Sequence, residues 1–240
     1  MAKPISVTEY IKLFFSPQKI TPQLSQACAL GTKLHSLIDK FLETQNIPPI
    51  SSETLQVLSF FQDYKHLTLV NKEQRLYDES LLLSGRYDAL FKDRDNNYYL
   101  CDWKRSAFIR ETSQYYSHDP QLAHLPDCAY AKYALQLNLY CVLLKRVENI
   151  TIKKMYLVQF HPKIDNYICQ EIPHMRDEIQ YLLQKRMSQT QLFISKPINT
   201  TINTTINTTI NTTINTTNDE NNKLEPYSLP VLIKRRRLNI

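Results

Sequence analysis

Two acidic residues and a lysine on neighbouring predicted strands could form a catalytic centre. Segment 100–104 reads Leu-Cys-Asp-Trp-Lys, and side chains two apart on a β-strand point to the same face. Asp102 and Lys104 therefore share a face, while Trp103 points the other way and keeps its backbone carbonyl near the carboxylate. Asp88 lies on the preceding predicted strand. If the two strands pair as a hairpin in suitable register, the two carboxylates converge.

The chemistry that these groups favour is metal-assisted hydrolysis of a phosphodiester. Carboxylates and a carbonyl oxygen form an oxygen-only site that suits Mg²⁺ or Mn²⁺. A metal bound by Asp88, Asp102 and the Trp103 carbonyl would activate water and neutralise charge on a phosphate. Lys104 beside it could orient or deprotonate the attacking water and stabilise the transition state.

The surroundings of this tripeptide distinguish it from an ordinary surface strand. An isolated Asp-x-Lys tripeptide is common on solvated strands and usually has no catalytic role. Here the strand is apolar, a bulky Trp103 stands in the middle, and Leu-Leu-Leu-Ser-Gly-Arg-Tyr-Asp over 81–88 precedes it at hairpin distance. This context favours a catalytic site over an ordinary exposed hairpin.

Changes in hydrophobic period place the hairpin among helices. Apolar residues recur at helical spacing in four regions and alternate or run continuously in four others. The predicted helices are 30–42 (ending near Asn46 and Pro48), 53–65 (with Ser51 or Ser52 as cap), 126–147 and one from Pro173 to about Phe193; the predicted strands are 73–91, 98–104, 150–160 and 166–172, with a polar turn over 93–97. This order predicts an α/β (α+β) fold with a central mixed sheet flanked by helices.

Composition bounds the remaining possibilities. The 240 residues suit one catalytic domain, and no stretch approaches the roughly 20 apolar residues that span a bilayer, so we expect a soluble, intracellular protein. Five scattered cysteines without a Cys-x-x-Cys pair predict reduced thiols and no zinc site. The net charge of +6 suits a polyanionic partner only mildly. Of only two glycines, Gly31 and Gly85, we expect each to be required sterically.

The C-terminal segment 197–240 differs from the predicted domain 1–196. Residues 198–217 are five copies of Ile-Asn-Thr-Thr, a low-complexity pattern that offers no large apolar face and predicts a disordered linker. The basic run 234–237, Lys-Arg-Arg-Arg, fits a nuclear import signal, an auxiliary phosphate contact or a solvated tail.

Four elements in order resemble the RecB-like branch of the PD-(D/E)XK nuclease superfamily, which includes lambda-type exonucleases and mitochondrial genome maintenance exonucleases. They are Gly-Thr-Lys-Leu-His over 31–35, Gly-Arg-Tyr-Asp over 85–88, Asp-Trp-Lys over 102–104, and Gln-Leu-Asn-Leu-Tyr over 136–140. The resemblance spans 31–140 and implies a restriction-endonuclease-like fold.

The resemblance also implies roles for residues outside the hairpin. His35 would reach the metal, and Gln136 and Tyr140, four apart on one helix face, would bind the scissile phosphate or orient Lys104. Alternatively, His35 is a core histidine and the Gln136–Tyr140 pair is merely polar packing. Glu73 could be an extra acidic ligand, although a solvated strand residue is the simpler interpretation. The cysteine cluster that holds an iron–sulfur centre in part of the branch is lacking, so no such cluster is expected.

The favoured function is a Mg²⁺- or Mn²⁺-dependent deoxyribonuclease, an exonuclease acting on single strands or duplex ends in repair, recombination or genome maintenance. No phosphate-binding loop of a helicase motor is present, so unwinding would need a helicase or replication partner. An RNA endonuclease of the cap-snatching type and an inactive nucleic-acid-binding module are the alternatives. The nucleus, a viral replication site and the mitochondrion all stay open as locations.

Overall fold

The computed structural model describes residues 4–17, 19, 21–47 and 51–194. The predicted linker and basic tail over 197–240 lie outside the described residues. Within the described part, no helix combines the length and the apolar character needed to cross a membrane.

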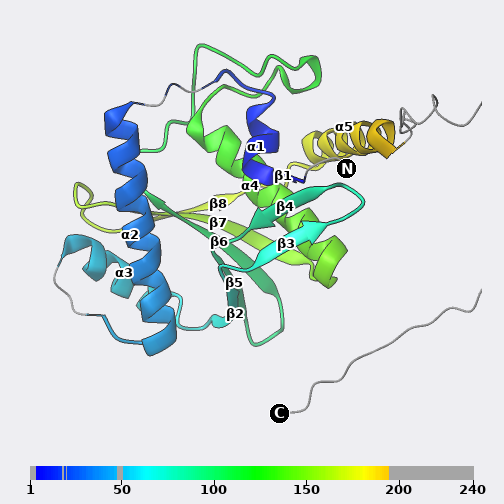
Figure 1. Cartoon of the computed structure of the whole chain (residues 1–240). Helices are drawn as coiled ribbons and strands as arrows, with labels where there is room; N and C mark the ends of the chain where they lie inside the picture. Colours follow the sequence, from blue (N-terminus) through cyan, green and yellow to red (C-terminus); the bar gives the residue numbers. More distant parts are fainter. Residues whose placement is uncertain (1–3, 18, 20, 48–50, 195–240) are drawn as a thin grey trace, which may run out of the picture. The chain divides into compact units, whose positions relative to one another are not determined.

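The central feature is a mixed five-stranded sheet (Figure 1). Only β6 and β7 pair in parallel, and the other neighbours are antiparallel. In spatial order the strands are β2 (Thr68–Lys72), β5 (Ala89–Lys92), β6 (Tyr98–Arg105), β7 (Ile152–Phe160) and β8 (Ile168–Ile172). A second sheet has the order β1 (Ile5–Ser6), β4 (Leu83–Arg86) and β3 (Arg75–Asp78). The predicted class, a mixed α/β fold with helices flanking a central sheet, is confirmed.

Helices cover the two faces of the five-stranded sheet (Figure 1). On one side α2 (Pro22–Thr44) and α3 (Ser52–Asp63) pack against a cluster that includes Phe91, Trp103 and Phe160. On the other side α1 (Val7–Lys12), α4 (Ala129–Leu143) and α5 (Arg176–Ile194) pack against a cluster that includes Leu100 and Leu157. Alternate residues of β6 therefore serve opposite faces, as strand geometry requires.

Local signals explain where the helices that carry or support the site begin. Thr21 caps α2 through its hydroxyl, which accepts from the Leu24 N–H at 3.2 Å, and Pro22 takes the first helical position, where its missing N–H costs nothing. Ser51 caps α3 in a reciprocal pairing with Thr54. The predicted cap at Ser51 is confirmed.

The predicted hairpin is confirmed as β5 and β6, which pair antiparallel from Lys92↔Tyr98 to Ala89↔Cys101. Asp93 closes its turn, because one carboxylate oxygen accepts the N–H groups of Asp95 and Asn97, each at 2.9 Å. The polar residues of the turn, which the sequence shows directly, therefore stabilise the hairpin.

Several boundaries differ from the sequence prediction. The single strand predicted over 73–91 is three strands, β3, β4 and β5, because the chain turns after Asp78 and again at Tyr87 and Asp88. Helix α2 begins at Pro22 rather than Leu30, since its first turns are exposed and carry no apolar period. The helix predicted over 126–147 is α4 followed by a π-helical turn over Leu144–Glu148. The short β1, α1 and β2 were not predicted.

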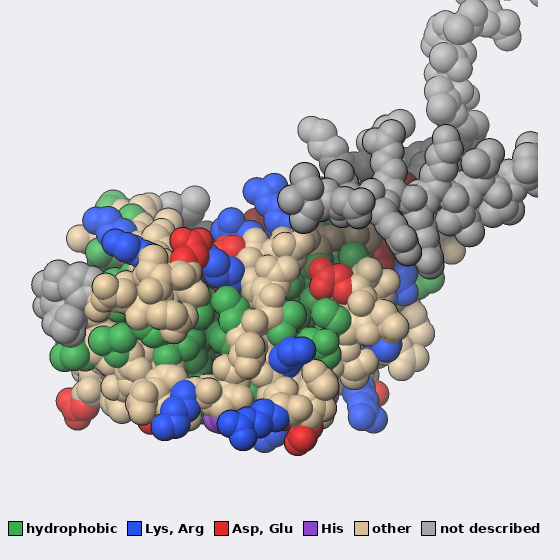
Figure 2. All heavy atoms as spheres, turned by 90° about the horizontal axis from the view of Figure 1, so that it is seen from below, with side chains coloured by type: hydrophobic (Ala, Val, Ile, Leu, Met, Phe, Trp, Pro, Cys, Tyr) green, Lys and Arg blue, Asp and Glu red, His purple; other side chains and the backbone are tan. Residues whose placement is uncertain are grey.

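On one face of the molecule the basic side chains are dispersed. Figure 2 shows one face on which Lys and Arg side chains stand apart from one another, with hydrophobic and polar surface between them. The described part of this face carries no continuous basic patch.

Candidate metal centre

The hairpin register brings Asp88 to the backbone of β6. Asp88 lies one position beyond the terminal pair Ala89↔Cys101, opposite Asp102. Its Oδ2 accepts a hydrogen bond from the Trp103 N–H at 2.7 Å. The carboxylate is therefore fixed to the strand that carries the Asp-Trp-Lys segment.

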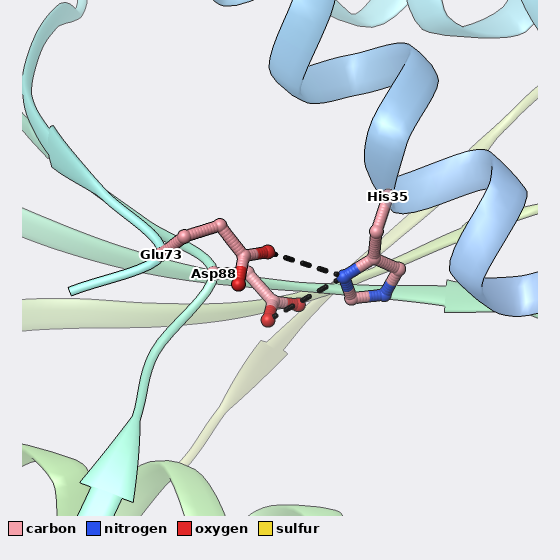
Figure 3. A group of neighbouring side chains, drawn as sticks. All are labelled: His35, Glu73 and Asp88. Atoms are coloured by element: carbon pink, nitrogen blue, oxygen red, sulfur yellow. Dashed lines mark ion pairs between the residues drawn. The ribbon is translucent and has the colours of Figure 1, made fainter. Parts of the chain in front are cut away.

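His35 reaches the same strand from α2. Its Nε2 lies 3.0 Å from the Trp103 carbonyl oxygen. Because a carbonyl oxygen only accepts, the hydrogen bond requires the proton on Nε2. In the neutral ring this leaves the lone pair on Nδ1, which faces Glu73 Oε1 at 3.5 Å and Asp88 Oδ1 at 3.7 Å (Figure 3). A partner on one ring nitrogen that frees the other is the usual arrangement around a metal-binding histidine.

Glu73 joins the group from the turn between β2 and β3. It has a left-handed backbone conformation (φ 48°), and its N–H donates to the Asp88 carbonyl at 2.9 Å. Its side chain is one quarter exposed and also contacts Arg86 Nε at 3.0 Å. The expectation of a solvated strand residue is wrong, because the turn directs this carboxylate inward toward His35. Sequence alone showed only an acidic residue before Gly85.

His35, Glu73 and Asp88 together could hold a metal ion. Each offers one ligand atom, and the three atoms lie within 4.8 Å of one another. One nitrogen and two carboxylate groups suit a divalent cation of the first transition row as well as Mg²⁺. The set forms on the described residues from three separate elements, so the fold itself assembles it.

Asp102 is not a member of that group and pairs with Lys104 instead. Lys104 Nζ lies 2.5 Å from Asp102 Oδ2 and 4.6 Å above the centre of the Tyr133 ring. The buried Oδ2 atom makes no well-aligned hydrogen bond with any described group, so the contact is an ion pair with poor directionality. The roles predicted for Asp102 and for the Trp103 carbonyl as metal ligands stay predictions.

The electrostatics of the centre favour an added positive charge. Burial, reinforced by the nearby Asp102 carboxylate, raises the pKa of Asp88 to about 7. Burial alone would lower the pKa of His35, but contacts with Glu73 and Asp88 outweigh burial and raise it. The His35 contact is the main cause that lowers the pKa of Glu73. A divalent ion would relieve the repulsion that Asp88 experiences.

Lys104 is a cation in this environment. Burial by itself would lower the pKa of its ammonium group, but the carboxylates of Asp102 and Asp88 outweigh burial and raise it above the ordinary value. Of the two roles considered for Lys104, the cationic one fits this environment better than proton abstraction does.

Gln136 and Tyr140 of α4 line the approach to the centre. The Gln136 amide donates to the Tyr140 hydroxyl at 2.8 Å and to the Thr8 hydroxyl at 3.3 Å. The Tyr140 ring lies directly against Gly85: a methyl group there would come 2.5 Å from a ring carbon. Gly85 is therefore required sterically, as predicted, whereas a methyl at Gly31 would meet nothing within 4 Å, so that half of the prediction is wrong.

These groups open on a cleft of about 790 Å³. The residues that line the cleft include His35 and Asp88, Gln136 and Tyr140 of α4, and the two arginines Arg75 and Arg86. Its volume lies within the range of ordinary ligand sites. A polyanion entering it would meet two guanidinium groups beside the candidate metal ligands.

Comparison with known proteins gives only distant similarity. No family model matches the sequence, and no curated protein matches it. Among solved structures, an alkaline exonuclease from Laribacter hongkongensis superposes with a TM-score of 0.41 and 8% identity, covering 79% of this chain and 87% of that one. A protein from Eubacterium rectale with a provisional exonuclease assignment gives a TM-score of 0.43 and 12% identity, covering 79% of each chain. Similarity this low carries no functional argument, so the chemistry of the site must supply it.

Proposed function

We propose that this chain is a divalent-metal-dependent nuclease of the PD-(D/E)XK type that hydrolyses phosphodiester bonds in DNA. The observation that carries the proposal is the convergence of His35, Glu73 and Asp88 within 4.8 Å, with the Lys104–Asp102 pair on the adjoining strand. With its Nδ1 between the two carboxylates, His35 would complete a set of one nitrogen and two oxygen ligands for one ion.

The residues present fit a divalent ion. His35 Nδ1 and the carboxylates of Glu73 and Asp88 would hold it, and Asp102 is the nearest further carboxylate on β6. The raised pKa of Asp88 supports this fit, because a buried carboxyl beside a second carboxylate binds protons or cations readily. A bound ion would supply an activated water and neutralise charge on the phosphate.

The chain's own side chains would position the DNA. Arg75 and Arg86, which are cross-strand partners on β3 and β4, line the cleft and would bind the phosphate backbone of the DNA. Lys104, cationic through its carboxylate neighbours, would stabilise charge on the phosphate as the bond breaks. Tyr140, held by Gln136, would offer its hydroxyl proton to a phosphate oxygen.

The test is cleavage of end-labelled single- and double-stranded DNA with Mg²⁺, with Mn²⁺ and with EDTA, and with an RNA strand in parallel. We expect metal-dependent cleavage of DNA that EDTA abolishes. Lys104→Met should reduce cleavage by a factor of about 100 or more while DNA binding is retained, since one transition-state cation is worth that much. Lys154→Met, which removes an exposed lysine of β7 paired with Glu171, is the control and should cut normally.

Three results would contradict the proposal or a part of it. If Lys104→Met cleaved DNA as fast as the wild type, Lys104 would have no role in the cleavage reaction. Cleavage of RNA but not DNA would move the substrate class to RNA. DNA binding without cleavage under every metal condition would favour the inactive binding module.

A further inference from the structure

A buried glutamine beside the proposed catalytic lysine has no partner for its amide oxygen. Gln159 of β7 is 5% exposed, and its Oε1 atom makes no hydrogen bond with any described group. Buried polar groups are almost always hydrogen-bonded, because leaving one unpaired costs stability. An unpaired group that persists in a central strand calls for a reason other than folding.

Three other buried side-chain atoms lack a hydrogen bond in the described part of the chain. Two of them are carboxylate oxygens that form an ion pair with a basic side chain. Glu53 Oε1 lies 2.7 Å from Arg105 Nε, and Asp102 Oδ2 contacts Lys104. The Tyr87 hydroxyl is the third, and it lies within the core cluster under α4. The Gln159 amide oxygen has neither a hydrogen bond nor an ion pair, and Gln159 lies next to Lys104 of the proposed catalytic site.

The strand register puts Gln159 beside Lys104. The two residues are Cα partners in the parallel β6–β7 ladder, and strands in a sheet lie about 4.8 Å apart. Paired residues project to the same face. Gln159 has the same parity as Leu157, which packs under α4, while Val158 faces α2 and α3. Gln159 therefore projects to the α4 side of the sheet, where Lys104 contacts Tyr133.

Lys104 has room for a second acceptor. An ammonium group carries three donors. Among the described side chains, the only polar contact of Lys104 Nζ is Asp102, and the Tyr133 ring covers another side. If Asp102 turns from Lys104 toward the metal, the Tyr133 ring is the contact that is left, and no hydrogen-bond acceptor among the present contacts would hold the ammonium group.

We propose that Gln159 is a positioning residue for Lys104: its amide oxygen accepts a hydrogen bond from the ammonium group when Asp102 turns toward the metal and Lys104 faces the substrate phosphate. The proposal rests on the proposed function, since it assigns Gln159 a task in that reaction. In the free protein Lys104 contacts Asp102, and the Gln159 amide oxygen has no hydrogen-bond partner among the described groups. Gln159 acts through Lys104 and does not itself touch the substrate.

A second buried glutamine provides the matched control. Gln56 of α3 is 2% exposed, and its amide is fully used: it donates to the carbonyls of His161 and Ile164 and accepts from the His161 N–H. Gln56 therefore has a purely structural set of partners on the other face of the sheet. The same substitution at the two positions should have opposite effects.

The experiment compares Gln159→Met and Gln56→Met in the full chain. Methionine matches the length of glutamine and removes the amide. We expect Gln159→Met to keep or raise the Tm of the metal-free protein and to bind Mn²⁺ and DNA as the wild type does. Its single-turnover cleavage rate at saturating DNA should fall about 10-fold, the effect of losing one hydrogen bond to a charged group. Gln56→Met should lower the Tm and leave the rate of the folded fraction unchanged.

A conservative variant separates the acceptor from the shape of the side chain. Gln159→Glu keeps an acceptor oxygen at the same reach and should cut faster than Gln159→Met. A wild-type rate in Gln159→Met would overturn the inference while leaving the proposed nuclease intact. A fall in Tm like that of Gln56→Met, with an unchanged rate, would make Gln159 structural. A wild type that cuts no DNA with any metal would instead overturn the proposed function.

Discussion

At the scale of single residues, the two glycines lie in opposite surroundings, one crowded and one open. Gly85 lies where the Tyr140 ring leaves no space for a side chain, and Tyr140 is itself buried and held by Gln136. Gly31 lies within α2 with open space where its side chain would be. The sequence showed that both positions are unusual but could not show which one is crowded, because the crowding comes from α4.

The pair gives a direct stability prediction. Gly85→Ala should lower the free energy of unfolding by about 1–3 kcal/mol, the usual cost of overpacking a core, and should reduce cleavage by displacing Tyr140. Gly31→Ala should raise the free energy of unfolding by up to about 1 kcal/mol, because alanine is the better helix former. Urea denaturation measures both. An unfolding free energy unchanged in Gly85→Ala would show that the Tyr140 contact is not tight.

Glu73 shows the limit of sequence reasoning for single residues. Its contact with His35 depends on a left-handed backbone conformation in the turn after β2, a strand that the apolar pattern did not indicate. Asp88, Asp102 and Lys104 were predictable as neighbours because strand alternation and a hairpin turn determine their placement. A side chain directed by an irregular turn has no such periodic signal.

At the scale of elements, regular and irregular segments were predictable to different degrees. The hairpin, the long helices and the strands β7 and β8 follow apolar patterns that persist over many residues. Helix α1 has six residues, too few to display a period, and it is stabilised by distant contacts: the Tyr10 hydroxyl donates to the Leu182 carbonyl of α5 at 2.7 Å. The local sequence therefore did not predict helix α1 or its position in the fold.

Asp119 links two elements and gives a prediction on pH. Its carboxylate accepts from Lys185 and from the Tyr181 hydroxyl, both on α5. Burial alone would raise the pKa of Asp119, but these hydrogen bonds outweigh burial and lower it below the ordinary 3.8. The contribution to stability is therefore complete above pH 3.8 and is lost as the pH falls through the lowered pKa.

Asp119→Asn should accordingly lower the Tm at pH 7, and the difference from the wild type should narrow below pH 3.8. Glu9→Gln is the control, because Glu9 and Lys12 form an exposed pair about 60% accessible on each side and should change the Tm little at any pH. A Tm difference for Asp119→Asn that stays constant down to the acid limit would contradict the assignment of the stability to this carboxylate.

At the scale of the whole molecule, the fold class followed from the order of elements, whereas the assembly of the site did not. The site needs α2, the turn after β2, the β5–β6 hairpin and α4 to meet at one end of the sheet. The resemblance in motifs predicted that His35 would approach Asp88. Only the packing of α2 against β6 shows which nitrogen of His35 faces the carboxylates.

The described residues, which end at 194, all belong to one compact unit of the chain. A chain ending at Pro197 should therefore keep the Tm of the full chain and its cleavage rate on short DNA, as the predicted boundary at 196 also requires. Thermal melting and the cleavage assay check this. A fall in Tm of several degrees on truncation would show that residues beyond Pro197 stabilise the domain.

The most direct test of the metal centre is calorimetric titration of the purified protein with Mn²⁺ in the absence of DNA. The wild type should bind one ion at the centre, and Asp88→Asn and Glu73→Gln should each weaken binding at least about 10-fold, as loss of groups at a metal site does. Asp39→Asn, which alters an exposed carboxylate paired with Lys72, should bind as the wild type does. If the wild type takes up no Mn²⁺, or if all four proteins bind it equally, His35, Glu73 and Asp88 do not form a metal site.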